Sequence, residues 1–342
     1  MKVRSIVCRE IKEDIGSVKL EEVDVPAPGS NEVRIRLKAC AVNFPDLLMI
    51  QGKYQFKPDL PFAPGGEASG DIEACGDKVT KFKEGDAVVV SMRHGGFSEA
   101  VVVSENDIRI KPKGMDYAQA ASYQTSYLTA YVALYRRGDL QEGEALLVHG
   151  ATGGVGMAAV DLGKHFGARV IATGGTDRKL DVVKQRGAEA VINYTQPDGT
   201  LGGFREEVKS LTAGLGADVI YDPVGGDIFD ESMRCINWGG RILTIGFTSG
   251  RWPLAPVNLI LIKQISVIGV RAGEYGRQDP VKGKENTDEI YRLAEEGLIS
   301  PYVSHAFPIE RSVEAMRLLE NREVIGKAVV TMNGYELGKE SI

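Results

Sequence analysis

The sequence predicts an α/β protein with two domains, one rich in β-strands and one built on a doubly wound parallel sheet. The chain has 342 residues, and a domain usually contains about 100–200 residues. Short strands separated by turn residues fill its first third, whereas buried strands alternate with amphipathic helices from residue 145 onward. The pattern changes near residue 117, which marks the expected boundary.

The first part of the chain contains several short strand patterns. Residues 32–39 alternate polar and apolar side chains, which is typical of a strand with one buried face. The further expected strands are residues 70–74, 86–90 and 99–103. Proline and glycine turns separate these strands. This part is therefore expected to be mainly β-structure.

The middle of the chain predicts a parallel sheet. Alanine and tyrosine recur at helical spacing over residues 117–137. Beyond them, β-branched strands alternate with helices, which indicates βαβ units. The expected strands are residues 145–149, 169–173, 190–193, 218–221, 241–246 and 266–271, with helices over 155–166 and 177–185. The tail predicts helices over 285–296 and 309–321 and strands over 302–307 and 328–331. We expect this tail to rejoin the first domain.

The composition argues against several classes of protein. With 41 basic and 47 acidic residues the net charge is −6, so no nucleic-acid partner is expected. No apolar run reaches the roughly 18 residues that cross a bilayer, and the first residues lack a signal-peptide core, so no membrane partner is expected. The 4 cysteines, Cys8, Cys40, Cys75 and Cys235, are widely spaced, which argues against a disulfide framework. We expect a reduced, cytoplasmic protein.

A glycine-rich loop is the strongest local signal. Residues 149–156 read His-Gly-Ala-Thr-Gly-Gly-Val-Gly, after a buried strand and at the start of a helix. Backbone N–H groups and the positive helix end at such a loop can bind a pyrophosphate. Ala151 stands where a strict G-x-G-x-x-G pattern has its first glycine. A second βα unit follows, which strengthens the signal; the alternative is a tight turn without a ligand.

The end of the next strand indicates which dinucleotide binds. An NAD site usually carries Asp or Glu about 20 residues after the glycines, whereas residues 173–176 are Thr-Gly-Gly-Thr. Arg178 and Lys179 follow and can pair with a 2′-phosphate, although they could equally form a solvated helix face. Asp177 is the competing ribose ligand, but helix capping also explains it. The sequence favours NADPH over NADH.

Six segments in consistent order carry a resemblance to a known family. They are residues 41–46 (AVNFPD), 51–54 (QGKY), 61–67 (PFAPGGE), 151–156 (ATGGVG), 221–226 (YDPVGG) and 326–329 (GKAV). Together they resemble the zinc-independent medium-chain dehydrogenase/reductases, in particular the NADPH:quinone oxidoreductases. The segments cover nearly the whole chain.

The resemblance implies a fold with the active site between two domains. It implies a GroES-like distorted β-barrel that forms the catalytic domain, interrupted by an NADP-binding Rossmann domain. The expected bounds are residues 1–122 for the first part of the catalytic domain, 123–272 for the Rossmann domain and 273–342 for the second catalytic part.

The same comparison of motifs argues against a metal. Zinc-dependent relatives carry a catalytic-metal Cys where this chain has Asn43, and a His where it has Gly66. The lobe that holds a structural zinc with four cysteines is missing too. The 4 histidines, His94, His149, His165 and His305, show no ligand spacing and are expected on the surface or in loops. We therefore expect no metal ligands.

Tyr54 and Asn43 are the catalytic candidates that the resemblance implies. In 2-enoyl thioester reductases the tyrosine matching Tyr54 is the proposed proton donor, whereas in quinone reductases it mainly lines the cleft; both roles stay open. Asn43 is expected beside the nicotinamide ribose, with a bond to loop backbone as the alternative. Asp46 is expected to hold the loop.

The remaining cofactor contacts follow by position from the resemblance. Thr129 is expected to reach the nicotinamide end, and the alternative is a bond from its hydroxyl to its own helix. The other implied contacts are Thr152, Gly153, Gly154 and Val155 at the pyrophosphate, Gly174, Lys179 and Tyr194 near the 2′-phosphate, Gly246, Phe247 and Thr248 near the nicotinamide, and Val270 at the carboxamide with Lys327 close by. Residues 266–271 form the usual subunit-pairing edge of the family, so a homodimer is expected.

Three functions are compatible with these features. The first is an NADPH-dependent reductase of quinones or α,β-unsaturated carbonyls. The second is a 2-enoyl-CoA or acyl-carrier reductase, which would need a basic patch for the carrier phosphates; Lys53, Lys57 and Arg93 are candidates. The third is an NADPH-binding regulatory or RNA-binding protein with little catalysis, and the acidic net charge argues against RNA.

Overall fold

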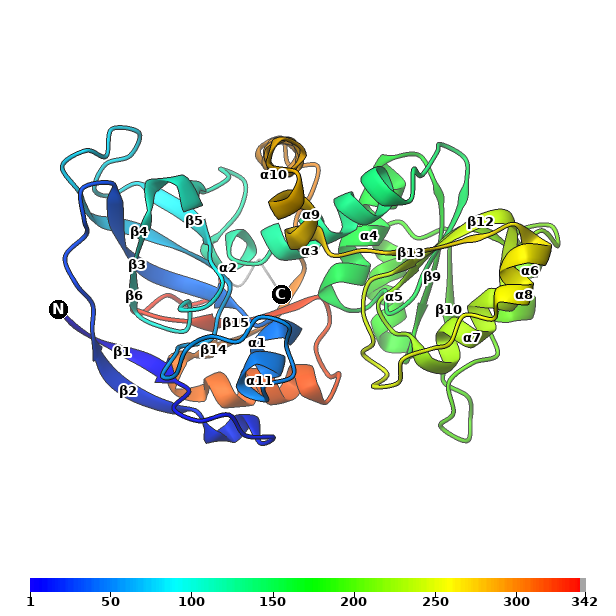
Figure 1. Ribbon diagram of the computed structural model, residues 1–342, viewed down its shortest axis with the longest axis horizontal. Coiled ribbons are helices and arrows are strands. Elements are labelled where there is room, and N and C mark those ends of the chain that lie inside the picture. The colour runs from blue at the N-terminus through cyan, green and yellow to red at the C-terminus, as the bar shows by residue number, and fades with distance from the viewer. Residues whose placement is uncertain (339–342) are drawn as a thin grey trace. The chain divides into compact units, whose positions relative to one another are not determined.

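The computed structural model describes residues 1–338, and its chain divides into two compact units (Figure 1). The first unit contains residues 1–124 and the chain from residue 300, and the second contains residues 125–299. The first crossing lies close to the expected 122, but the second lies at 299 rather than 272. Residues 273–299 stay with the second unit because helices α9 (Ala272–Gln278) and α10 (Pro280–Glu295) pack on each other, and α9 packs on the π-helix η3 (Val132–Arg137).

Strands from both ends of the chain build the first unit. They are β1 (Lys2–Val7), β2 (Lys19–Asp24), β3 (Glu32–Ala41), β4 (Glu67–Cys75), β5 (Ala87–Ser91), β6 (Ala100–Ser104), β7 (Ile108–Ile110), β14 (Val303–Pro308) and β15 (Lys327–Thr331). The main sheet has the order β14-β15-β3-β4-β5-β7, and β6 also pairs with β3. β1 and β2 form a separate antiparallel pair. The predicted alternation in β3 is confirmed, because Val33, Ile35 and Leu37 are fully buried.

The helices of the first unit are short. They are α1 (Phe44–Ile50), α2 (Tyr117–Ala120) and α11 (Ser312–Glu320), with 3-10 turns η1 (Ile15–Ser17), η2 (Glu105–Asp107) and η4 (Ile309–Arg311). α1 packs on α11 (Figure 1). The single helix expected over residues 117–137 is instead α2, α3 (Gln124–Tyr131) and η3. The break after α2 coincides with the passage of the chain from the first unit into the second.

A six-stranded parallel sheet forms the second unit. Its strands are β8 (Ala145–Val148), β9 (Arg169–Gly174), β10 (Ala190–Asn193), β11 (Ala217–Asp222), β12 (Ile236–Thr244) and β13 (Ser266–Gly269), and its further helices are α4 (Gly154–His165), α5 (Asp177–Gln185), α6 (Arg205–Leu211), α7 (Gly226–Cys235) and α8 (Val257–Lys263). The strand order is β10-β9-β8-β11-β12-β13. The chain therefore leaves β8 in one direction and resumes on its other side at β11, and open sheets bind ligands at the carboxyl ends of such neighbouring strands.

The core of this sheet explains why its strands lack alternation. Leu146, Leu147 and Val148 in β8 and Val219 and Ile220 in β11 are all fully buried. Both faces are covered, since α4 packs on β8 and β9, α5 packs on β9 and β10, and α7 packs on β11 (Figure 1). Among residues 1–338, no helix combines the length and the apolar character needed to cross a membrane.

Candidate active site and cofactor site

A buried ion pair lies at the start of α1 in the first unit. The Lys327 Nζ is 2.9 Å from Glu67 Oε1, and the two side chains are only 5% and 2% exposed. The same ammonium donates to Asn43 Oδ1 at 2.6 Å, while Asn43 Nδ2 donates to Glu67 Oε1 at 3.0 Å. β15, β4 and the residue before α1 supply these three side chains. Both terminal atoms of the Asn43 amide are therefore held in place.

Asp46 fixes the backbone beside this ion pair. Its Oδ2 accepts from the Asn43 N–H at 2.8 Å, and its Oδ1 accepts from the Gly65 N–H at 2.9 Å. Burial raises the pKa of Asp46 to about 6. Gly65 has φ +99°, and a Cβ there would lie 2.7 Å from the Phe97 N and 2.8 Å from Cys40 Sγ. Asp46 thus holds the loop, and only glycine fits where the loop meets its neighbours.

Glu67 is a third member of this cluster, and it was not among the candidate site residues. Asn43 and Lys327 were expected separately along the cofactor, but they touch each other, and Glu67 binds both. Lys327 is 4% exposed as a whole residue, whereas Asn43 is half-buried. Glu67 begins a strand of small and apolar residues, which is the signal that could have identified it. A carboxylate in such a buried strand needs a cationic or hydrogen-bonding partner.

Tyr54 lies in the turn that follows α1. Its N–H donates to the Leu48 carbonyl at 3.2 Å, and its ring packs against the core of the first unit. The residue is half-buried, and among the described residues its hydroxyl has no hydrogen-bond partner. The hydroxyl is therefore available to a ligand or to water.

The glycine loop of the second unit connects β8 to α4. The Gly153 N–H donates to the Gly150 carbonyl, and the Ala151 N–H donates to the Thr173 carbonyl, both at 3.0 Å. Gly156 lies against the same turn, and a Cβ on it would be 2.3 Å from the Gly150 carbonyl oxygen. Gly153 is the N-cap of α4, so the first N–H groups of the helix have no partner within it. The predicted residues Thr152, Gly153, Gly154 and Val155 are half-buried here. Such a loop can bind a pyrophosphate.

The end of β9 forms the place expected for the adenosine. A Cβ on Gly174 would lie 2.8 Å from Thr152 Cγ2, and Thr195 Oγ1 donates to the Gly175 carbonyl at 2.9 Å. The ring of Tyr194, which is 8% exposed, lies beside Gly175. Residues 173–176 bring no carboxylate to this end of the strand.

Helix α5 brings two cations to the same end of the sheet. Arg178 is exposed and Lys179 is half-buried in its first turn. The N-cap is Thr176 rather than Asp177, and Asp177 Oδ1 accepts from Asn193 Nδ2 at 2.9 Å. These residues suit a 2′-phosphate better than a free ribose hydroxyl.

The residues expected near the nicotinamide follow β12 and β13. The Thr248 N–H donates to the Pro223 carbonyl at 3.1 Å, and Phe247, which is 40% exposed, lies beside Gly225. Gly246 precedes them in the same turn. The Val270 N–H donates to the Thr244 carbonyl at 3.0 Å, so a carboxamide would bind to the Val270 carbonyl.

Thr129 makes the hydrogen bond to its own helix that was named as the alternative to a nicotinamide contact. Its hydroxyl donates to the Thr125 carbonyl one turn earlier, at 2.7 Å. The residue is half-buried in α3. The same hydroxyl can still accept a hydrogen bond from a carboxamide N–H while it donates to Thr125.

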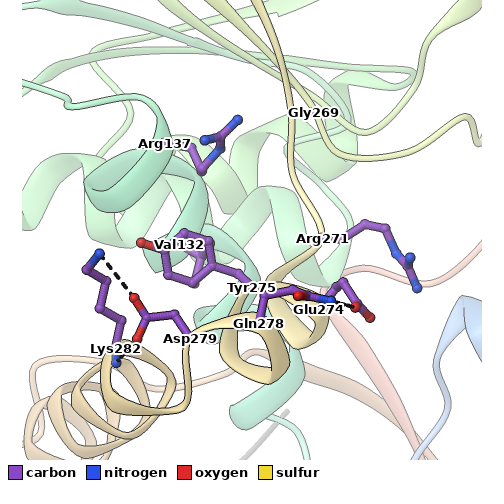
Figure 2. A pocket seen from close by; sticks show the side chains of 9 residues that line it. All are labelled: Val132, Arg137, Gly269, Arg271, Glu274, Tyr275, Gln278, Asp279 and Lys282. Atoms are coloured by element: carbon purple, nitrogen blue, oxygen red, sulfur yellow. Dashed lines mark hydrogen bonds and ion pairs between the residues drawn. The ribbon is translucent and has the colours of Figure 1, made fainter.

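A pocket of about 350 Å³ opens where β13 passes into α9 (Figure 2). It is lined by Val132, Arg137, Gly269, Arg271, Glu274, Tyr275, Gln278, Asp279 and Lys282. An ion pair of 3.1 Å between Lys282 and Asp279 lies on one side. None of the cofactor residues expected from the sequence lines this pocket, although Gly269 and Arg271 flank Val270 in the chain.

His149 lies in the turn after β8 and is fully buried. The turn agrees with the expected surface or loop position, whereas the burial of the ring was not expected. Its Nδ1 is 2.8 Å from Thr173 Oγ1, and its Nε2 is 2.8 Å from Ser232 Oγ. Burial lowers the pKa of His149 to about 3, so the ring is neutral. It joins the ends of β8 and β9 to α7 directly before the glycine loop.

Replacing His149 by glutamine should remove the loss of unfolding free energy that acidification causes through this residue. The unfolded chain binds a proton at His149 below pH 6.5, and the folded chain does so only near pH 3. Acid therefore favours the unfolded state of the wild type, by about 1.4 kcal/mol per pH unit across this window. Asp46 and Asp222, whose pKa values burial raises to about 6, act in the opposite direction in both proteins.

Urea unfolding of both proteins at pH 7, 6 and 5, followed by circular dichroism, checks this prediction. The difference in unfolding free energy between wild type and variant should shrink as the pH falls. A difference that stays constant with pH would mean that His149 is not held neutral.

The described residues show no arrangement typical of a metal site. Within residues 1–338, no group of three or more His, Cys, Asp or Glu side chains could hold an ion. The cysteines are all free thiols, and three of the four are buried.

Two family models match the chain, one on each unit. The alcohol dehydrogenase GroES-like domain matches residues 29–113, and the zinc-binding dehydrogenase domain matches residues 154–283. Among curated proteins, the quinone oxidoreductase-like protein 2 homolog of Nematostella vectensis is 37% identical over 330 residues, which cover 96% of this chain and 88% of that protein. The human quinone oxidoreductase is 28% identical over 313 residues, covering 91% and 92% of the two chains.

Solved structures agree with this assignment over nearly the full length. The crystal structure of an NAD-dependent alcohol dehydrogenase has a TM-score of 0.87 at 33% identity and covers 96% of this chain and 100% of that one. A mycobacterial protein complexed with NADPH has a TM-score of 0.85 at 27% identity, with 96% and 99% covered. The CurK enoyl reductase has a TM-score of 0.84 at 26% identity, with 97% and 99% covered. The family models on both units and these relatives point to the same family. The chain therefore belongs to the medium-chain dehydrogenase/reductase family.

Proposed function

We propose that the protein is an NADPH-dependent oxidoreductase that reduces a quinone or an α,β-unsaturated carbonyl without a metal. The observation that carries the proposal is the donor set around Asn43. At the position where zinc-dependent relatives place a metal-binding cysteine, this chain has an amide whose two polar atoms are bonded to Glu67 and Lys327. The amide and ammonium are hydrogen-bonding groups, and neither is a usual zinc ligand.

The second unit fits a phosphorylated dinucleotide. We assign the pyrophosphate to Thr152, Gly153, Gly154 and Val155, and the 2′-phosphate to Gly174, Lys179 and Tyr194. We assign Gly246, Phe247, Thr248, Val270 and Thr129 to the nicotinamide half and Asn43 to its ribose, with Lys327 fixing the Asn43 amide. Bound NADPH supplies a hydride to the acceptor. The choice of NADPH rests on the absence of a carboxylate at residues 173–176 and on the two cations of α5.

The chain contributes hydrogen bonding and a proton to this reaction. Addition of a hydride places negative charge on the acceptor oxygen, and a hydrogen-bond donor near that oxygen stabilises it. The Tyr54 hydroxyl, which has no partner in the described part of the chain, is our candidate donor. Lys327 and Glu67 would act through Asn43 as positioning residues, because they are buried.

Exchange of Tyr54 for phenylalanine tests the role of this hydroxyl. We expect kcat for an enone to fall about 100-fold, because a positioned general acid contributes at least that much. The quinone rate should fall much less, since a quinol oxyanion takes a proton readily from water. The measurement is NADPH oxidation with both acceptors, with Tyr135→Phe, an exposed tyrosine of the second unit, as the control. Equal rates for wild type and Y54F on both acceptors would show that Tyr54 only lines the substrate site.

A reductase of 2-enoyl thioesters is the second candidate. It is favoured by the likeness to the CurK enoyl reductase. Absorbance loss of NADPH with a quinone, a simple enone and crotonyl-CoA separates the two functions. Tight NADPH binding without turnover of any acceptor would contradict both and favour a nucleotide-binding protein with little catalysis.

The free edge of the parallel sheet supports a homodimer. β13 ends the sheet, and near it Val257, Leu261 and Ile262 in α8 are 77%, 78% and 69% exposed. An apolar edge of this kind invites pairing with another strand. Sedimentation should give twice the 37.0 kDa of one chain, and a monomer at micromolar concentration would contradict the proposal. The reduced cysteines fit a cytoplasmic location.

A further inference from the structure

Two loops of the first unit are fastened together beside the buried ion pair. They are residues 51–66 and residues 91–97. The Met92 N–H donates to the Gly66 carbonyl and the Gly96 N–H to the Gly65 carbonyl, each at 2.9 Å. Glu67 follows Gly66 directly, so the second loop is fixed next to the strand that carries the ion pair. The side chains of these loops, Tyr54 among them, therefore belong to the same unit as Asn43.

A row of flat side chains joins the two loops. The Arg93 Cζ lies 4.7 Å from the centre of the Phe56 ring. The Phe56 and His94 rings are stacked, with centres 6.1 Å apart and an angle of 18° between their planes. The His94 and Phe62 rings form a T-shaped contact, with centres 5.9 Å apart and an angle of 73° between their planes. Phe56 follows Tyr54 by two residues. We call this set, Arg93, Phe56, His94 and Phe62, the Arg93 stack.

The charge of Arg93 is not compensated by the chain. Many arginines of this protein pair with a carboxylate, as Arg34 does with Glu73 and Arg186 with Asp161. Arg93 is exposed, and among residues 1–338 no carboxylate lies within ion-pair distance of it. A guanidinium that lies on an aromatic ring keeps the N–H groups of its edge free for a ligand.

The surroundings of the stack are positive although the chain is acidic. The two loops contain Lys53, Lys57 and Arg93 but a single carboxylate, Asp59, in a chain of net charge −6. Lys53 is paired with Glu13, with 3.8 Å between Nζ and Oε1, so the local excess of positive charge comes from Lys57 and Arg93. Burial, together with the charge of Arg93, lowers the pKa of His94, so this ring is neutral and can act as an apolar wall. An anion that approaches these loops therefore meets a favourable potential.

We propose that Arg93 binds a carboxylate or phosphate group on the acceptor, so that the preferred substrate is a planar unsaturated carbonyl compound that carries an anion. The proposal rests on the proposed function for the reaction itself. The guanidinium fork matches both anions through two parallel hydrogen bonds. The rings of the Arg93 stack hold the guanidinium in place, and one of them, Phe56, lies two residues from Tyr54 in the chain. Arg93 is then a specificity-determining residue that separates anionic acceptors from neutral ones.

The test compares matched anionic and neutral probes on wild type and Arg93→Met. Calorimetry measures the Kd of 2-naphthoate, 2-naphthyl phosphate and neutral 2-naphthamide in the presence of NADP⁺. Kinetics measure kcat/KM for 1,4-naphthoquinone-2-carboxylate and its carboxamide, and for crotonyl-CoA and the phosphate-free crotonyl thioester of N-acetylcysteamine. Arg93→Lys keeps the charge without the fork, and Lys81→Met, an exposed lysine of the same unit, controls for the loss of one positive charge.

The proposal expects the ratio of anionic to neutral affinity to fall at least about tenfold in R93M. R93K should lie between R93M and wild type, and K81M should keep the wild-type ratio. The probe with the larger loss identifies the anion as carboxylate or phosphate. An unchanged ratio in R93M, or an equal loss in K81M, overturns the proposal. Turnover of neutral acceptors without anion preference would refute the Arg93 site and leave the proposed function intact. Arg93-dependent anion binding without turnover of any acceptor would support the Arg93 site and contradict the proposed function.

Discussion

Replacing Lys327 by methionine should lower the free energy of unfolding by about 3–5 kcal/mol, which is the usual cost of leaving one member of a buried ion pair alone. Glu67 is 2% exposed in its side chain and would be left without the ammonium that pairs with it. The Asn43 amide would also lose the donor to its Oδ1.

The double variant Lys327→Met/Glu67→Gln is the matched control. It removes both charges, and most of the lost stability should return, because a neutral pair of similar volume often costs little. Urea unfolding should be followed by circular dichroism and by hydrogen exchange of β15. Trp238 and Trp252, the 2 tryptophans, both lie in the second unit, so their fluorescence would not report on this change. A double variant no more stable than K327M would show that the ion pair is not the cause.

Gly156→Ala should weaken NADPH binding by more than about tenfold, or 1.4 kcal/mol. A Cβ at this position would lie 2.3 Å from the Gly150 carbonyl oxygen and 2.8 Å from the Ala151 Cα. Both are backbone atoms of the turn itself, so no side chain can move aside to make room. The first turn of α4 would have to shift away from β8, and with it the N–H groups that we assign to the pyrophosphate.

Fluorescence titration with NADPH measures the affinity, and thermal unfolding without cofactor measures the cost to the fold. Gly114→Ala is the control, since no atom lies within 4 Å of a Cβ there. Its affinity should match that of the wild type. A G156A protein that binds NADPH normally would show that the loop tolerates the shift and does not hold the pyrophosphate in this form.

The pattern of hydrophobic residues was enough to predict most of the parallel sheet. Helix α5 and strand β10 have the expected bounds, and β8 and β9 differ by one residue. Helix α5 is amphipathic, the strands are continuous apolar runs, and clear turn residues bound them. α1 was not predicted, because its seven residues show little periodicity and its start depends on the mutual bonds of Asn43 and Asp46. The return of the chain at residue 300 depends on the packing of α9 and α10, which no local pattern encodes.

The site residues show a similar limit. Motif positions brought Asn43, Tyr54 and the glycine loop forward as candidates, and the roles assigned to them remain predictions. Glu67 could not be paired with Lys327 from the sequence, because 260 residues separate them. The burial of His149 was not predicted, because its hydrogen-bond partners lie in β9 and α7, 24 and 83 residues away along the chain. Such contacts follow from tertiary packing and not from spacing along the chain.

The use of both chain ends in the first unit has a consequence for biosynthesis. The second unit is one continuous stretch, residues 125–299, and can form as soon as it leaves the ribosome. The first unit must wait for β15, which pairs with β3 almost three hundred positions earlier and carries Lys327. Until then the carboxylate of Glu67 has no cation to neutralise it. The site that we assign to the acceptor is therefore the last part of the molecule to be assembled, and a nascent chain that lacks its final strand has a dinucleotide fold with no finished place for a substrate.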